Sequence, residues 1–130
     1  MRALAAALAL LTACNRAPNT SLGDRQVIRA AEIATITSGN AYDIVAKLRP
    51  EFLRSRGPLS AAAGRATVTP EITVYIDGIE AGPSTQILPQ VRAVDVHEIR
   101  MYRAADATTK YGTRHAAGVI EVTTIRLAKP

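Results

Sequence analysis

The feature that most constrains the fold is an alternating segment followed by an Asp-Gly pair. Residues 72–76 alternate between Ile or Val and more polar side chains, which is the period of a half-buried β-strand. Asp77 and Gly78 follow, and both residue types tolerate the positive φ angles that a tight hairpin turn requires. The sequence therefore predicts a β-hairpin whose short return strand covers residues 79–81.

A second segment predicts the central strand of a sheet. Residues 118–124 read Gly-Val-Ile-Glu-Val-Thr-Thr, so both alternating sets of side chains are β-branched or apolar apart from Glu121. Strands that are buried on both faces have this composition. Residues 26–28 predict a short edge strand, and residues 100–103 predict a further strand with Met101 facing inward. Together these segments predict a mixed sheet of about four short strands.

The clearest helix signal begins at Asn40. This residue is a good N-cap, and the Asp43 carboxylate sits where it favours the helix N-terminus. From Ala41 onward, apolar residues recur at i, i+3, i+4 and i+7 and form a single apolar face. Pro50 stops or kinks this helix, which we expect to end near Arg56.

Weaker helical patterns flank the predicted hairpin. Residues 29–36 have helical character, and residues 86–94 carry Ile, Leu and Val at helical spacing. Val96 and Ile99 are three residues apart and suggest one more helical turn, whereas residues 104–110 suggest a helical turn or a loop. A chain of 130 residues has room for one domain. We therefore expect a small α+β domain with two to three helices packed on the sheet.

The amino terminus has the pattern of an export signal. Arg2 precedes an apolar run of eleven residues that ends at Ala13, too short to span a bilayer but suited to a signal peptide. The residues Leu-Thr-Ala before Cys14 make this segment resemble a bacterial lipobox. Residues 14–24 are rich in Asn, Pro, Thr, Ser and Gly. We expect a signal peptide over residues 1–13 and a flexible tether over residues 14–24.

Cys14 is the only cysteine of the chain, so an internal disulfide and a multi-cysteine zinc site are excluded. The lipobox resemblance implies that its thiol carries a lipid. Each buried methylene contributes about 0.8 kcal/mol, so several acyl chains would anchor the protein to a membrane permanently. Asn15 stands where an Asp would favour retention at the inner membrane, which points to the outer membrane. The alternative is an ordinary secretory signal with a coincidental cysteine.

Four segments together resemble the plug domain of TonB-dependent outer-membrane receptors. Their order and spacing agree with the plug over residues 72–124, and residues 27–48 resemble its opening more weakly. The resemblance implies a plug-like α+β domain over residues 25–127. The four segments are Val74–Gly78, Val96–Arg103, Asp106–Gly112 and Ala117–Thr124. The resemblance marks as turn and fold residues Asp77, Gly78, Asp106, Tyr111, Gly112 and Gly118.

The chain also departs from the receptor pattern. Arg100 stands where the receptors carry a signature Glu, and Arg103-Ala104-Ala105 replaces an Arg-Gly-Pro segment. No convincing TonB box is present in the sequence. We expect the domain to stand alone, without the barrel that follows it in the receptors, and therefore not to carry out energised transport by itself.

Nothing in the sequence predicts catalysis. His97 and His115 are the only histidines and lack metal-ligand spacing, and we expect both to be at least partly exposed. Asp77 and Asp106 are better explained as turn residues than as an acid–base pair, and Tyr111 is expected to pack under its turn. No nucleophile elbow or phosphate-binding loop is present. We therefore expect no enzyme activity, no cofactor and no metal.

The charge pattern limits the partners. The net charge is +5, but Lys and Arg are dispersed with no block of five or six, so we do not expect nucleic-acid binding. The leading hypothesis is a non-catalytic, periplasm-facing lipoprotein of the outer membrane that binds an outer-membrane barrel or another envelope protein. The alternative is a small-ligand-binding periplasmic lipoprotein, in which the loop after Gly57 and the 113–117 loop cap a site. An enzyme remains the third and weakest reading.

Overall fold

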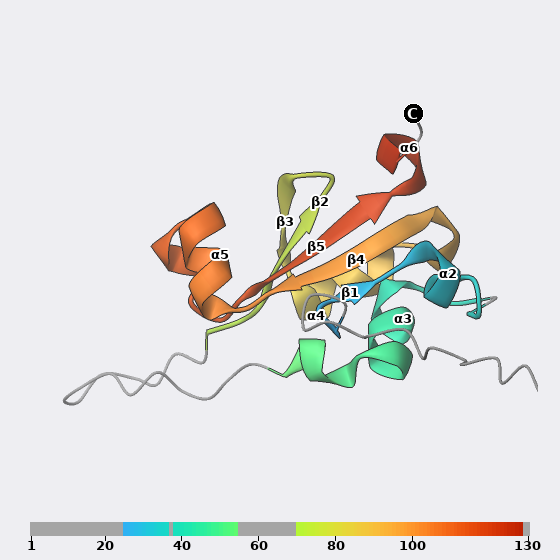
Figure 1. Ribbon diagram of the computed structural model, residues 1–130, viewed down its shortest axis with the longest axis horizontal. Helices are drawn as coiled ribbons and strands as arrows, with labels where there is room; N and C mark the ends of the chain where they lie inside the picture. The colour runs from blue at the N-terminus through green and yellow to red at the C-terminus, as the bar shows by residue number, and fades with distance from the viewer. Residues whose placement is uncertain (1–24, 37, 55–69, 129–130) are drawn as a thin grey trace, which may run out of the picture.

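A computed structural model describes residues 25–36, 38–54 and 70–128 of the chain. These residues form a mixed five-stranded sheet in the order β1-β4-β5-β2-β3, with helices packed against it (Figure 1). β5 pairs with β2 in parallel, and every other neighbouring pair is antiparallel. The predicted α+β class is confirmed, with five strands instead of about four. The strands are β1 (Val27–Ile28), β2 (Thr73–Ile76), β3 (Ile79–Pro83), β4 (Val96–Tyr102) and β5 (Val119–Thr124).

α2, α3 and α4 lie on one face of the sheet, whereas α5 lies at one end and packs against the other face (Figure 1). The larger hydrophobic core lies between α3 and the sheet residues Val74, Ile99 and Ile120. A smaller cluster on the other face joins Tyr75 and Val119 to α5. Alternate residues of one strand therefore serve the two faces, as the strand period requires. The helices are α2 (Ala30–Ile33), α3 (Ala41–Leu48), α4 (Ser84–Ile87), α5 (Ala104–Tyr111) and α6 (Ile125–Ala128).

The hairpin between β2 and β3 is present as predicted. Asp77 and Gly78 have φ angles of 52° and 84°, the conformation of the tight turn that their residue types favour. The return strand continues through Gly82 to Pro83, two residues beyond the predicted end. β5 lies between β4 and β2, so its predicted central position is also correct.

The helix that begins after Asn40 has a reciprocal cap. The Asn40 side chain accepts a hydrogen bond from the Asp43 backbone N–H, and the Asp43 carboxylate accepts one from the Asn40 N–H, both at 3.0 Å. The helix does not continue to Arg56, because α3 ends at Leu48. A separate 3₁₀ turn follows at Pro50–Leu53. Proline has no N–H to continue the α-helical hydrogen bonds, so the chain is redirected there.

The expected helical turn at Val96–Ile99 is wrong, because β4 already begins at Val96. The register against β5 shifts between Val96 and Glu98, where the strand carries a β-bulge. The extra residue of a bulge changes the alternation locally. Val96 and Ile99 are therefore both buried although they are three residues apart. The bulge therefore gave two buried residues three positions apart, a spacing that is also typical of a helix.

The helix expected over residues 86–94 is three shorter pieces. α4 ends at Ile87, a 3₁₀ turn covers Leu88–Gln90, and a second one covers Ala93–Asp95. Pro89 lies in the first 3₁₀ turn, where its missing N–H prevents α4 from continuing. Residues 104–110, expected to be a helical turn or a loop, are helical and belong to the two-turn helix α5. α4, the two 3₁₀ turns and α5 connect the strands on which the candidate sites are built.

Candidate functional site

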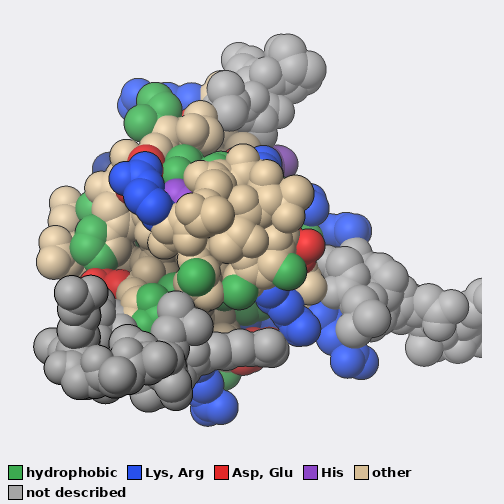
Figure 2. Space-filling model, turned by 90° about the vertical axis from the view of Figure 1, so that its left-hand side faces the viewer, with side chains coloured by type: hydrophobic (Ala, Val, Ile, Leu, Met, Phe, Trp, Pro, Cys, Tyr) green, Lys and Arg blue, Asp and Glu red, His purple; other side chains and the backbone are tan. Residues whose placement is uncertain are grey.

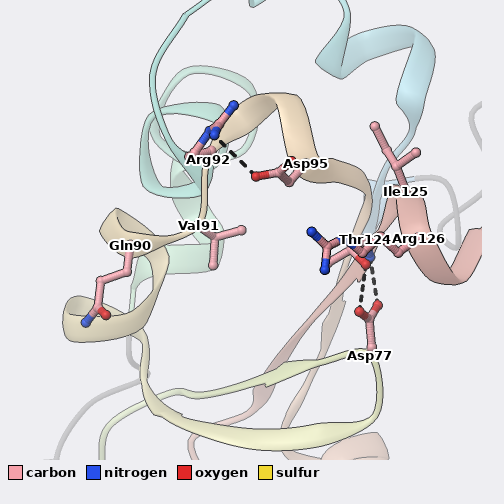
Figure 3. Close-up of a pocket in the computed structure, with 8 residues that line it drawn as sticks. All are labelled: Asp77, Gln90, Val91, Arg92, Asp95, Thr124, Ile125 and Arg126. Carbon is pink, nitrogen blue, oxygen red and sulfur yellow. Dashed lines mark hydrogen bonds and ion pairs between the residues drawn. The ribbon is translucent and has the colours of Figure 1, made fainter.

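Asp77 connects the hairpin turn to the end of β5. Its carboxylate accepts hydrogen bonds from both the backbone N–H and the hydroxyl of Thr124, each at 2.7 Å (Figure 3). The Asp77 N–H donates to the Val122 carbonyl at 2.9 Å. Asp77, predicted from the sequence as a turn residue, thus binds the last residue of β5. Ile125 and Arg126 of α6 follow directly and lie at the same end of the sheet.

A polar hollow of about 300 Å³ lies beside this connection. Arg92 and Asp95 form an ion pair at 3.6 Å on its wall, and the Arg126 side chain extends toward it from α6 (Figure 3). The Arg92 and Asp95 side chains are both more than half exposed, so this pair contributes little to stability. The hollow is lined by Asp77, Gln90, Val91, Arg92, Asp95, Thr124, Ile125 and Arg126.

An apolar groove of about 350 Å³ adjoins the hollow and shares Ile125 with it. Val94 and Ile125, both in the wall of the groove, are 56% and 52% exposed. Ile79, just after the hairpin turn, is 74% exposed. We call the region formed by Asp77, Ile79, Val94, Ile125 and Arg126 the turn end. The remaining groove residues are Ala30, Ile33, Ala34, Ile36, Ala93, Val96 and His97.

The opposite face of the sheet carries an aromatic cluster under α5. The ring of Tyr111 lies 4.3 Å from that of Tyr75 and 5.6 Å from that of Tyr102, measured between centroids. Tyr111 thus packs between the end of α5 and the sheet. Burial raises the pKa of Tyr75 and of Tyr111, with a further contribution at Tyr75 from its hydrogen bond to Glu80. Both phenols therefore remain neutral at physiological pH.

Lys110 and Glu121 connect α5 to β5 through Tyr102. The Lys110 ammonium donates to the Tyr102 hydroxyl at 2.8 Å and lies 3.2 Å from Glu121, and the same hydroxyl donates to Glu121 at 2.8 Å. Burial favours the neutral amine, but these hydrogen bonds outweigh it and raise the pKa of Lys110 above its usual value. Lys110 therefore stays protonated and forms a charged contact between α5 and β5.

His115 is buried, which corrects the expectation that it is exposed. It is only 3% exposed because the 3₁₀ turn Thr113–His115 places its ring beside Tyr75. Its Nε2 lies 3.2 Å from the Tyr75 hydroxyl, and its Nδ1 is buried without a hydrogen-bond partner in the described part of the chain. The small residues around His115 gave no periodicity from which this burial could be predicted.

The remaining predicted residues are separated in space. Asp106 is an exposed residue in the first helical turn of α5. Gly112 caps the C-terminus of this helix with a φ angle of 100°, and Gly118 precedes β5 with a φ angle of 102°. Asp77 lies beside the other end of β5, so the two aspartates form no acid–base pair. Cys14 lies outside the described residues.

A third cavity, which sequence reasoning missed, lies where β1 and β4 approach the turn before β5. Its volume is about 170 Å³, and its apolar wall contains Phe52, Met101 and Ala117. We call it the arginine pocket, because Arg25, Arg54 and Arg103 also line it. These arginines come from three distant parts of the sequence, so no local motif could reveal the site. Its other lining residues are Gln26, Glu51, Ala104 and Ala116.

The side of the molecule that carries α5 is shown in Figure 2. Lys and Arg side chains lie in separate groups around it (Figure 2). Within residues 25–36, 38–54 and 70–128, no cluster of three His, Cys, Asp or Glu side chains is placed to hold a metal ion. In the same ranges, no helix has both the length and the apolar character needed to cross a bilayer. Comparisons with family models, curated proteins and solved structures gave no match.

Proposed function

We propose that this protein is a non-catalytic, lipid-anchored protein of the outer membrane whose plug-like domain binds a partner protein through the turn end. Cys14 carries the lipid, and the domain faces the periplasm. The partner is an outer-membrane barrel or another envelope protein. The proposal rests above all on the exposure of Val94 and Ile125 beside an apolar groove. Exposed apolar side chains that gather around a groove are typical of protein-binding surfaces.

The chemistry of the turn end suits a protein partner. Its apolar groove lies next to a polar hollow that contains the Arg92–Asp95 pair and Arg126. An apolar centre with a charged margin is the usual composition of a protein interface. Of the four large hydrophobic side chains that are exposed among the described residues, only Tyr42 lies on an element away from the turn end. This distribution favours one interface over a uniformly apolar surface.

The test is site-specific photo-crosslinking in intact cells, with a photoreactive residue introduced at Arg126. We expect a discrete cross-linked envelope protein, identified by mass spectrometry and confirmed by reciprocal purification. The double variant Val94→Asp and Ile125→Asp should lose this product, because two buried carboxylates would remain unpaired in the interface. Tyr42→Asp is the matched control and should keep it. A cross-link unaffected by the double variant would contradict the proposal, as would the absence of any specific product.

The arginine pocket favours small-ligand binding as a second candidate function. It is lined by Ala116 and Ala117, part of the 113–117 segment that we expected to cap a ligand site. The loop after Gly57, the other expected cap, lies outside the described residues. Only a ligand that binds the native state raises the unfolding temperature. A reproducible thermal shift with a fractionated periplasmic extract would support this function, and the absence of any shift across all fractions would count against it.

A further inference from the structure

None of the three arginines that line the arginine pocket has a carboxylate partner among the described residues. Arg25 precedes β1, Arg54 follows the 3₁₀ turn Pro50–Leu53, and Arg103 follows β4. They reach one pocket from three separate segments. By contrast, four other arginines each lie within ion-pair distance of a carboxylate. These are Arg49 with Glu32, Arg92 with Asp95, Arg100 with Glu98 and Arg114 with Glu80.

The charge inside the pocket is unbalanced. Its lining residues include three arginines, all exposed, and a single acidic residue, Glu51. A guanidinium group is always charged and presents paired N–H donors that match the two oxygens of a carboxylate. An anion bound at this position would therefore meet donors from several directions. Such charge-assisted hydrogen bonds are stronger than those between neutral groups.

The inner wall of the same pocket is apolar. Phe52 and Met101 are 3% and 9% exposed, the half-buried Ala116 and Ala117 adjoin them, and the exposed Ala104 lies at the margin. The volume of about 170 Å³ is close to that of an engineered apolar cavity of about 150 Å³ that holds one benzene molecule. The pocket thus has room for one phenyl ring or a short branched aliphatic group, with the arginines beside it.

We propose that the arginine pocket binds a small amphipathic carboxylate, in which one carboxylate is joined to an apolar group about the size of a phenyl ring. The apolar group lies against Phe52 and Met101, and the carboxylate accepts hydrogen bonds from Arg54 and Arg103. This proposal rests on the second candidate function and names its site and its class of ligand. It is independent of the partner-binding surface at the turn end.

The test uses the full-length chain with Cys14→Ser and 3-phenylpropionate as the probe. Titration is followed by NMR at the ¹³C-labelled methyl group of Met101, which lines the pocket. We expect a saturable shift of this methyl signal. Loss of charge-assisted hydrogen bonds should make 3-phenylpropanol bind at least about tenfold more weakly. Acetate, which lacks the apolar group, and phenethylammonium, which has the opposite charge, should not bind.

Variants test the assigned residues. Arg54→Gln with Arg103→Gln should weaken probe binding at least about tenfold, since both charge-assisted contacts are lost. Arg100→Gln is the matched control. It removes an arginine from the same strand as Met101, but one that pairs with Glu98, and it should leave the affinity within about twofold. Circular dichroism confirms that each variant is folded.

Several results would overturn the proposal. No shift at Met101, equal binding of the alcohol, or unchanged affinity in the double arginine variant would each do so. A tripeptide with Phe between two Asp residues that binds more than tenfold better would assign the pocket to a protein segment instead. If an extract fraction raises the unfolding temperature while the probe leaves Met101 unmoved, the second candidate function stands and this site is wrong. If neither has an effect, both are wrong.

Discussion

Gly118 allows the backbone of β4 to approach closely, because it has no side chain. Its φ angle is +102°, and a Cβ atom added to it would lie 2.8 Å from the Tyr102 carbonyl oxygen and 2.9 Å from the Met101 methyl carbon. The backbone contact cannot move aside as a flexible side chain can. Gly118 is therefore required both by its conformation and by the close approach of β4.

We expect Gly118→Val to lower the free energy of unfolding by about 4 kcal/mol, through backbone strain and overpacking together. Gly112→Val is the control, because Gly112 has a similar φ angle of +100° but no atom within 4 Å of an added Cβ. It should cost only the strain, about 2 kcal/mol. Denaturant unfolding measures both. Equal losses would show that the contact with Tyr102 is unimportant.

Cys14 is the residue on which the proposed anchoring depends. Cys14→Ser removes the thiol that would carry the lipid, so we expect the protein to move from the membrane fraction to the soluble fraction. The added acyl mass should also disappear from the mass spectrum of the intact protein. If the variant carried the same added acyl mass as the wild type and fractionated with the membrane as the wild type does, the lipobox resemblance would be misleading.

At the scale of elements, α5 is attached to the sheet by a contact that depends on pH. Burial alone would raise the pKa of Glu121, but hydrogen bonds from Tyr102 and Lys110 outweigh it and hold this pKa below the ordinary glutamate value of 4.5. A carboxylate whose pKa is lower in the folded state than in the unfolded state stabilises the fold at pH values above its unfolded-state pKa. This stabilisation is lost as the pH falls through the pKa of Glu121 in the folded state.

We therefore expect the wild type to lose stability as the pH falls below about 4.5, and Glu121→Gln to lose less over the same interval. Tyr102→Phe removes the first of the two stabilising donors and should also reduce this dependence. Denaturant unfolding at a series of pH values measures the effect. The same acid sensitivity in all three proteins would rule out Glu121 as its source.

The turn and the cap with the clearest local signals were predicted correctly, whereas several features that depend on distant contacts were missed. The Asp77-Gly78 turn and the Asn40 cap are made by neighbouring residues, so the sequence contains the complete signal. The bulge in β4 depends on its pairing with β5. The burial of His115 depends on Tyr75, forty residues earlier in the chain. The arginine pocket combines three segments and has no local signal at all.

At the scale of the whole molecule, the two proposed surfaces lie at opposite ends of one strand. Val96 at the start of β4 lines the apolar groove of the turn end, whereas Met101 near its end lines the arginine pocket. The length of β4, from Val96 to Tyr102, separates them. Substitutions at sites that share no partners usually have independent effects.

We accordingly expect that Val94→Asp with Ile125→Asp leaves the affinity for 3-phenylpropionate within about twofold of the wild type. The reciprocal experiment uses Arg54→Gln with Arg103→Gln, which should leave the photo-crosslinked product unchanged. NMR titration and crosslinking measure the two activities separately. If either double variant impaired both activities, the two surfaces would be coupled, and the separation drawn between them would have to be abandoned.

The strand order has a consequence for how this chain folds. β5 is central in the sheet, yet it is the last strand along the described chain, so the β1–β4 and β2–β3 pairs cannot join into one sheet until residue 124 is available. Only the β2–β3 hairpin is local, and an isolated hairpin is marginally stable. We expect a chain truncated after Gly118 to lack the circular dichroism of a sheet and to be degraded rapidly by protease. Folding would then begin only after β5 has been synthesised, leaving until then the extended chain that the proposed export needs.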